Sequence, residues 1–153
     1  MRSAFMCVLL FTPLTQCQDK VSSDNLRQEL QGQFRVSAIE KSGEAPNKEF
    51  FEQIGTVEIK GDLFTITFQE GKKSESKTAT ISLDASKTPN EINLTPKDGD
   101  KLDQVVHGII KIDMDVVKIC WADSAKSPRP AKFETNKDNK HFMMTLIRIK
   151  TKK

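Results

Sequence analysis

Short runs in which apolar and polar residues alternate recur along the chain from residue 34 onward. A period of two is typical of β-strands that bury one face and expose the other. Turn-forming residues separate the runs at intervals of roughly ten residues, without the strand–helix alternation of a parallel sheet. We therefore expect an all-β domain, an antiparallel barrel or sandwich of roughly eight or nine strands. The strands are expected over residues 34–39, 57–68 (a hairpin around Lys60-Gly61-Asp62), 78–83, 92–96, 106–112, 116–121 and 142–149.

Two segments carry the signals of short helices. In residues 25–30, Leu26 and Leu30 lie four positions apart on one face, and residues 22–24 offer N-cap oxygens before them. Gly32 is expected to stop this helix as a C-cap residue. Residues 48–54 indicate one or two helical turns that point three apolar side chains inward: Phe50, Phe51 and Ile54.

The alternation also predicts which side chains face the interior. In residues 34–39, Phe34, Val36 and Ala38 alternate with polar neighbours until Ile39, which predicts that they share one face. In the hairpin of residues 106–121, Cys120 lies on the outer face or beneath a neighbouring segment. Its neighbours Val117, Ile119 and Trp121 point inward. Residues 71–76 are polar throughout, which favours a loop.

The first sixteen residues differ from the rest of the chain. A single Arg2 precedes an apolar run over residues 4–11, which is too short to cross a bilayer, and Pro13 follows it. This pattern is typical of a secretory signal peptide. Residues 14–17, Leu-Thr-Gln-Cys, resemble the cleavage box of bacterial lipoproteins, although Gln16 stands where that box has a small residue.

The box predicts a lipoprotein-type signal peptide over residues 1–16, a lipidated Cys17 with a tether over residues 17–24, and a β-barrel domain over residues 25–153. Acyl chains on Cys17 would hold the protein at a membrane, because each buried CH₂ group contributes about 0.8 kcal/mol. We expect an extracytoplasmic protein, anchored by lipid on the periplasmic or cell-envelope side. The alternative is a plain secretory signal and a secreted protein.

Cysteine usage agrees with this interpretation. Of the three cysteines, Cys7 lies in the leader, Cys17 in the cleavage box and Cys120 in an expected strand. Lipidation of Cys17 leaves Cys120 without a partner, which an exported domain tolerates when the thiol is buried and inert. A disulfide between Cys17 and Cys120 is the competing hypothesis.

Size and charge limit the classes of partner. With 153 residues, 37% hydrophobic and 29% charged, the chain suits one polar globular domain, expected to be a monomer. The formal net charge of +3 is small, and lysines and glutamates are interleaved, so we expect no nucleic-acid partner. The basic tail over residues 148–153 is interpreted as a solvated terminal strand.

Four short motifs follow one another in a specific order: Leu30-Gln31-Gly32-Gln33-Phe34, then residues 92–96, then residues 108–120, and then Arg129-Pro130 with Phe133. Together they resemble the uncharacterised lipocalin-like domain family that is abundant in planctomycete bacteria. The resemblance covers residues 26–150 and implies a calycin-type barrel whose interior holds a small apolar molecule. It implies no catalytic residue.

The chain departs from the family pattern at three positions. Phe34 replaces a Trp, Ile110 replaces a Tyr, and Met114 replaces a turn Gly. The first two changes remove an indole N–H and a hydroxyl, which are donors that a ligand or the barrel floor would use.

The candidate ligand-binding residues are the large side chains expected inside the barrel, together with one arginine. Arg129 lies between two prolines that restrict its backbone. It either pins its loop through ion pairs and carbonyl contacts or binds an anionic head group at the rim. The expected lining residues are Phe34, Phe64, Phe68, Ile110, Ile119, Trp121 and Met144.

Catalytic and metal chemistry find little support. His107 and His141 are the only histidines, and no Gly-x-Ser-x-Gly elbow surrounds any Ser. A nucleophilic Cys120 would need a pKa-lowering neighbour, and Lys118 is the one basic residue near it in sequence. The aspartates of residues 98–103 and 113–115 lack EF-hand spacing and are explained as turn formers, so we expect no metal and no cofactor.

We therefore expect a non-enzymatic module that binds a small hydrophobic molecule. The alternative is a structural or protein-interaction module of the cell envelope whose barrel is filled by its own side chains. A third hypothesis, an enzyme, would need a cleft that brings His107 or His141 together with another ionisable group.

Overall fold

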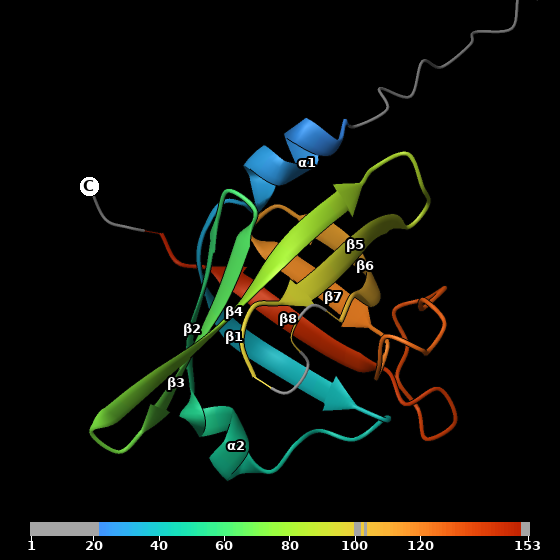
Figure 1. Cartoon of the computed structure of the whole chain (residues 1–153). Helices are drawn as coiled ribbons and strands as arrows, with labels where there is room; N and C mark the ends of the chain where they lie inside the picture. Colours follow the sequence, from blue (N-terminus) through green and yellow to red (C-terminus); the bar gives the residue numbers. More distant parts are fainter. Residues whose placement is uncertain (1–21, 100–101, 103, 151–153) are drawn as a thin grey trace, which may run out of the picture.

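The computed structural model describes residues 22–99, 102 and 104–150 (Figure 1). The expected signal peptide and Cys17 lie outside the described residues. The helices are α1 (Ser23–Leu30) and α2 (Lys48–Gln53). The strands are β1 (Gly32–Lys41), β2 (Ile54–Lys60), β3 (Leu63–Glu70), β4 (Lys73–Asp84), β5 (Asn90–Pro96), β6 (Val106–Asp113), β7 (Val116–Trp121) and β8 (Phe142–Arg148).

The eight strands form one closed antiparallel barrel. Each strand pairs with the next along the chain, and β8 returns to pair with β1 from Phe34↔Arg148 to Lys41↔Phe142. Closure leaves no sheet edge around the barrel wall itself. The sequence prediction of an antiparallel barrel of about eight strands with two short helices is confirmed.

Helix α1 closes one end of the barrel. Ser22 caps it by accepting a hydrogen bond from the Asn25 N–H at 3.2 Å, and Leu26 and Leu30 are buried at 2% and 0% exposure. Because both leucines belong to the main core, the helix stabilises the barrel through packing rather than through propensity. The side chain of Arg148 in β8 donates to two carbonyl oxygens near the end of α1, those of Glu29 and Gln31.

The expected role of Gly32 as a helix cap is wrong. The C-cap residue is Gln31, and Gly32 begins β1 with φ of 131°. A Cβ at this position would also lie 2.8 Å from Arg148 Nη1. Gly32 is therefore required by the sharp entry into the barrel, where other residues are strained.

The interior below α1 is filled by side chains from seven of the eight strands, and β3 adds Phe64 at 3% exposure. Phe34, Ile59, Ile81, Ile92, Ile110, Ile119 and Leu146 are all exposed by less than 2%. Burying each side chain of this size contributes roughly 1.5–3 kcal/mol. The alternation predicted for β6 and β7 is confirmed, since Val117 and Ile119 belong to this core and Trp121 packs against it.

Two expectations about inward side chains are wrong. The register of β1 against β8 shifts between Val36 and Ala38, so the next buried residue is Ile39 and Ala38 is exposed. A bulge of this kind inserts one residue and reverses the alternation beyond it. In α2, Phe50 is 39% exposed, whereas Phe51 and Ile54, the first residue of β2, pack against the core.

A second, smaller cluster lies outside the barrel wall. Ile109, Cys120 and Met143 project from β6, β7 and β8, and Phe133 packs over them from the segment between β7 and β8. Cys120 is therefore on the outer face and beneath a neighbouring segment, as the alternation predicts.

Strands β3 and β4 continue past the barrel as a two-stranded arm (Figure 1). Residues 73–76, expected to be a loop, belong to β4 and pair with β3, from Glu70↔Lys73 to Thr67↔Ser76. Strand β5 accompanies β4 only from Ala79 to Asp84.

Candidate functional site

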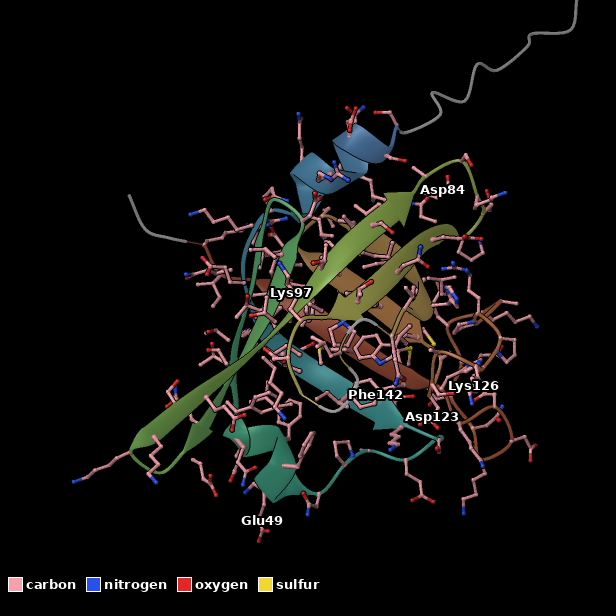
Figure 2. All side chains as sticks on the ribbon, in the orientation of Figure 1. Glu49, Asp84, Lys97, Asp123, Lys126 and Phe142 are labelled. Carbon is pink, nitrogen blue, oxygen red and sulfur yellow. The ribbon has the colours of Figure 1, made fainter. Side chains whose placement is uncertain are left out.

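A pocket of about 410 Å³ opens at the end of the barrel opposite α1. We call it the mouth pocket. Figure 2 labels Asp123 and Phe142 at this end. Its walls come from β3 to β7 and from the segments that follow β5 and β7. The lining residues are Phe64, Ile66, Lys77, Thr78, Ala79, Leu94, Pro96, Asp98, Gly99, Val106, Trp121, Ala122 and Asp123.

The walls of the mouth pocket are mainly apolar because the strands keep their alternation up to the rim. On the inward face of β3, Ile66 follows the buried Phe64. On the inward face of β4, Ala79 precedes the buried Ile81. Leu94 comes from β5. The pocket is thus an extension of the core toward solvent, with apolar surface left uncovered.

An aromatic pair strengthens one wall. Trp121 in β7 stacks on its cross-strand partner Phe142 in β8, with ring centroids 4.7 Å apart and planes at 26°. Such pairs contribute about 0.5–1.5 kcal/mol beyond their buried area. On the other side of Trp121, its partner in β6 is Gly108, where an added Cβ would lie 3.0 Å from the Trp121 Cβ and 2.8 Å from the Cys120 carbonyl oxygen. The missing side chain leaves space for the indole.

Polar groups occupy the rim of the mouth pocket. The Asp98 carboxylate accepts a hydrogen bond from the Thr78 N–H at 3.0 Å, and the Lys97 N–H donates to the Thr78 carbonyl at 2.9 Å. Lys77 places its ammonium 5.9 Å from the centre of the Phe68 ring. Asp98 thus acts as a turn residue. Among the described residues no group of three His, Cys, Asp or Glu side chains is arranged to hold a metal ion.

Arg129 lies outside the mouth pocket, against the outer surface of β5 and β6. Its guanidinium donates to the Ile92 carbonyl at 3.1 Å, to the Gly108 carbonyl and to Asn93 Oδ1 at 2.7 Å, and it pairs with Glu91 at 3.2 Å. These contacts are those of the structural alternative, in which the arginine pins its loop to the barrel.

The two histidines lie apart from each other and belong to different local networks. His107 Nδ1 is 3.0 Å from Asn93 Oδ1 and 3.4 Å from Arg129 Nη2, so this histidine belongs to the Arg129 network. His141 Nδ1 is 3.3 Å from the Glu134 carbonyl oxygen. Neither histidine lines the mouth pocket.

Cys120 forms no disulfide with any described residue and has no exposed surface. Burial raises its pKa to about 11, against 9.0 for an ordinary cysteine, although a contact with the Glu134 carbonyl opposes the shift. The side chain is therefore protonated at neutral pH, whereas the thiolate is the nucleophilic form.

The structure brings together only two of the residues expected to bind a ligand. Phe64 and Trp121 line the mouth pocket, whereas Phe34, Ile110, Ile119 and Met144 form the packed floor of the barrel and Phe68 lies farther out on the arm. Ile66, Ala79, Leu94 and Val106 line the pocket and were not singled out from the sequence. Their inward orientation follows from alternation, but their height along the barrel axis does not.

A scan of protein-family models and searches of curated proteins and solved structures found no match to this chain. Neither helix of the described part is long and apolar enough to cross a membrane.

Proposed function

We propose that this protein is a lipocalin-like binding module that holds a small, mainly apolar molecule in the mouth pocket. The observation that carries the proposal is a pocket of about 410 Å³ whose walls are an uncovered continuation of the core. This volume falls near the lower end of the range of roughly 300–1,000 Å³ found for small-molecule sites.

The shape of the barrel restricts the ligand. Phe34, Ile110 and Ile119 fill the floor, so a long acyl chain has no channel to enter. A compact ring or branched body fits between Phe64, Leu94 and Trp121, and its polar substituent remains at the rim near Lys77 and Asp98. Hydrophobic walls with a few polar groups are typical of such sites.

Export and anchoring form part of the same proposal. The support is the leader over residues 1–16 and the cleavage box ending at Cys17. The closed eight-stranded meander supports the resemblance to the lipocalin-like family, because lipocalins share this architecture. Since α1 lies at the closed end, the tether joins the barrel on the side away from the mouth pocket.

The second candidate function is a cell-envelope interaction module with a filled barrel. It is favoured by the packed floor and by three exposed apolar side chains in segments at the mouth end, Phe50, Leu102 and Val105. In this case apolar molecules would not bind inside the barrel.

An apolar fluorescent probe distinguishes the two functions. N-phenyl-1-naphthylamine bound in the mouth pocket should accept excitation energy from Trp121, the only tryptophan in the chain. Ala79→Phe fills the pocket and should abolish this signal. The control Ala38→Phe places the same side chain on the exposed face of β1, where Ala38 lines a separate groove against α2, and should leave the signal unchanged. Equal binding to wild type and Ala79→Phe would refute the proposal.

A further inference from the structure

The arm formed by β3 and β4 has one unpaired edge. Strand β4 begins at Lys73, but its pairing with β5 begins only at Ala79, where Pro96 ends β5. One residue further along β4, the Lys97 N–H donates to the Thr78 carbonyl and the Asp98 carboxylate accepts from the Thr78 N–H, so Thr78 is the last residue of β4 that a described residue bonds on this side. Within the described residues, no strand lies beside residues 73–77 on this side.

The direction of the backbone groups on this edge follows from two observed hydrogen bonds. Thr78 directs its N–H and C=O away from β3, toward Asp98 and Lys97. Ile81 directs its N–H toward β3, to the carbonyl of Asp62. Because these directions alternate along a strand, the backbone groups of Ser74 and Ser76 point out of the sheet edge. Both residues are exposed.

We propose that this edge binds an extended polypeptide segment that runs antiparallel to β4 and continues the line of β5. Two residues of the partner would each exchange a pair of backbone hydrogen bonds, one with Ser76 and one with Ser74. Strand addition of this kind obtains affinity from the main chain and specificity from alternate side chains.

The mouth pocket supplies the specificity site. Lys77 lies on the inward face of β4 with Ala79 and lines the pocket. A partner residue opposite Lys77 points its side chain to the same face. An aromatic or branched side chain at this position therefore enters the pocket toward Phe64 and Trp121. The edge and the pocket form one continuous surface.

Charges on the arm define the rest of the partner. Lys73 and Glu75 lie on the same face as Lys77, so the partner residue opposite Glu75 should be basic and the one opposite Lys73 acidic. The residues opposite Ser76 and Ser74 lie on the other face, where Ser76 bonds Thr67 at 3.1 Å, and should be polar. Read from its N-terminus, the partner segment opposite Lys77 to Lys73 is apolar, polar, basic, polar and acidic.

A second copy of this chain fits the edge poorly. If two β4 edges paired so that Ser74 and Ser76 exchanged all their backbone hydrogen bonds, Lys73 would face Lys77 twice and Glu75 would face its own copy. Shifting the pairing to place Glu75 opposite Lys77 requires Thr78, whose backbone groups are already bonded. The opposite shift places Glu75 opposite Lys73 but leaves Ser74 as the one fully exchanging residue within β4, because Ser76 then lies opposite Lys72 in the turn. Like charges directly opposite each other destabilise a sheet, so a foreign peptide is favoured.

The inference shares the mouth pocket with the proposed function but does not require that a small molecule binds there. The test uses the peptide acetyl-Ser-Phe-Thr-Lys-Thr-Glu-Ser-amide, carrying a fluorescent label, and measures anisotropy with the full-length chain. In one variant both Thr nitrogens are N-methylated, which removes the N–H groups directed at β4. In the matched control the Phe and Lys nitrogens are methylated, and these point away from β4.

We expect the plain and control peptides to bind alike and the Thr-methylated peptide to bind at least about tenfold more weakly, since two hydrogen bonds are lost. Equal affinity for both methylated peptides would overturn the proposal. So would the absence of saturable binding of the plain peptide at about 1 mM, because such affinity is negligible for a specific site.

A protein variant tests the edge from the other side. Ser76→Pro removes an N–H that no strand among the described residues uses, and proline is tolerated on sheet edges, so the barrel should fold and the peptide should fail to bind. Ser76→Ala, which keeps the N–H, should bind normally. If the wild type self-associates and Ser76→Pro abolishes that association, the edge binds a second copy of this chain and the proposal of a peptide partner is refuted. Binding of N-phenyl-1-naphthylamine should survive Ser76→Pro, so failures of the two proposals are distinguishable.

Discussion

Removal of the Arg129 guanidinium should destabilise the barrel and leave the mouth pocket intact. In the wild type this side chain, 23% exposed, binds the carbonyls of Ile92 and Gly108, Asn93 Oδ1 and the Glu91 carboxylate. Arg129→Ala removes all four contacts and leaves their acceptors partly buried.

The expected loss can be estimated from these contacts. A hydrogen bond to a charged group contributes about 1.5–3 kcal/mol, and a partly exposed ion pair contributes less than about 1 kcal/mol. Because water reaches some of the freed acceptors, we expect a total loss of roughly 2–4 kcal/mol rather than the full sum. For a domain of this size that corresponds to a melting temperature lowered by roughly 6–20 °C.

Thermal unfolding followed by circular dichroism gives the measurement, with Arg27→Ala as the matched control. Arg27 makes one ion pair, with Asp62 at 3.0 Å, and both side chains are more than one-third exposed, so its loss should be small. Binding of N-phenyl-1-naphthylamine should be unchanged in Arg129→Ala at temperatures where it is folded. An unchanged melting temperature with loss of a bound anionic ligand would show instead that Arg129 anchors a ligand.

Two further predictions concern the wall beside Trp121. Gly108→Ala should lower the free energy of unfolding by about 1–3 kcal/mol and weaken probe binding, because the new Cβ would lie 2.8 Å from the Cys120 carbonyl oxygen. Urea unfolding monitored by Trp121 fluorescence measures the loss. An unchanged free energy of unfolding would show that the backbone shifts to accept the methyl group. Cys120 should react with a thiol reagent only after unfolding. The pKa of Cys120 is raised from 9.0 to about 11 in the folded state, so the unfolded chain loses the thiol proton first as the pH rises. The free energy of unfolding should therefore decrease between pH 9 and 11 and be unaffected by this group below pH 9. A Cys120→Ala variant should lack that decrease.

The sequence was sufficient to predict the barrel because its strands bury only one face. Ile119 and Val117 alternate with Lys118 and Cys120, and this period is a direct consequence of burial. The same logic misplaced Ala38, because the bulge in β1 reverses which residues face the core, and no residue in the sequence signals a bulge at that point. It also missed the start of β4, since Lys73 to Lys77 are all exposed and a strand with no buried face has the composition of a loop.

The candidate site was predictable only in part. Alternation assigned Trp121 and Phe64 to the interior, but it assigned Phe34 and Ile110 there equally well. Whether an inward side chain fills the floor or lines the mouth depends on its height along the barrel axis, which is determined by strand stagger and by which end α1 closes. Neither has a local signal in the sequence.

The pairing of β8 with β1 has a consequence for how the domain is made. Ser37 and Thr145, joined by a hydrogen bond across this seam, are 108 positions apart in the chain. Contacts over such separations form slowly, because closing a loop of this length costs chain entropy before the contact adds stability. Strand β8 also pairs with β7, so β1 and β7 each keep one unpaired edge until Phe142–Arg148 is in place. Closure of the barrel therefore removes both open edges in one step, and until that step the edges of β1 and β7 are free to pair with other chains.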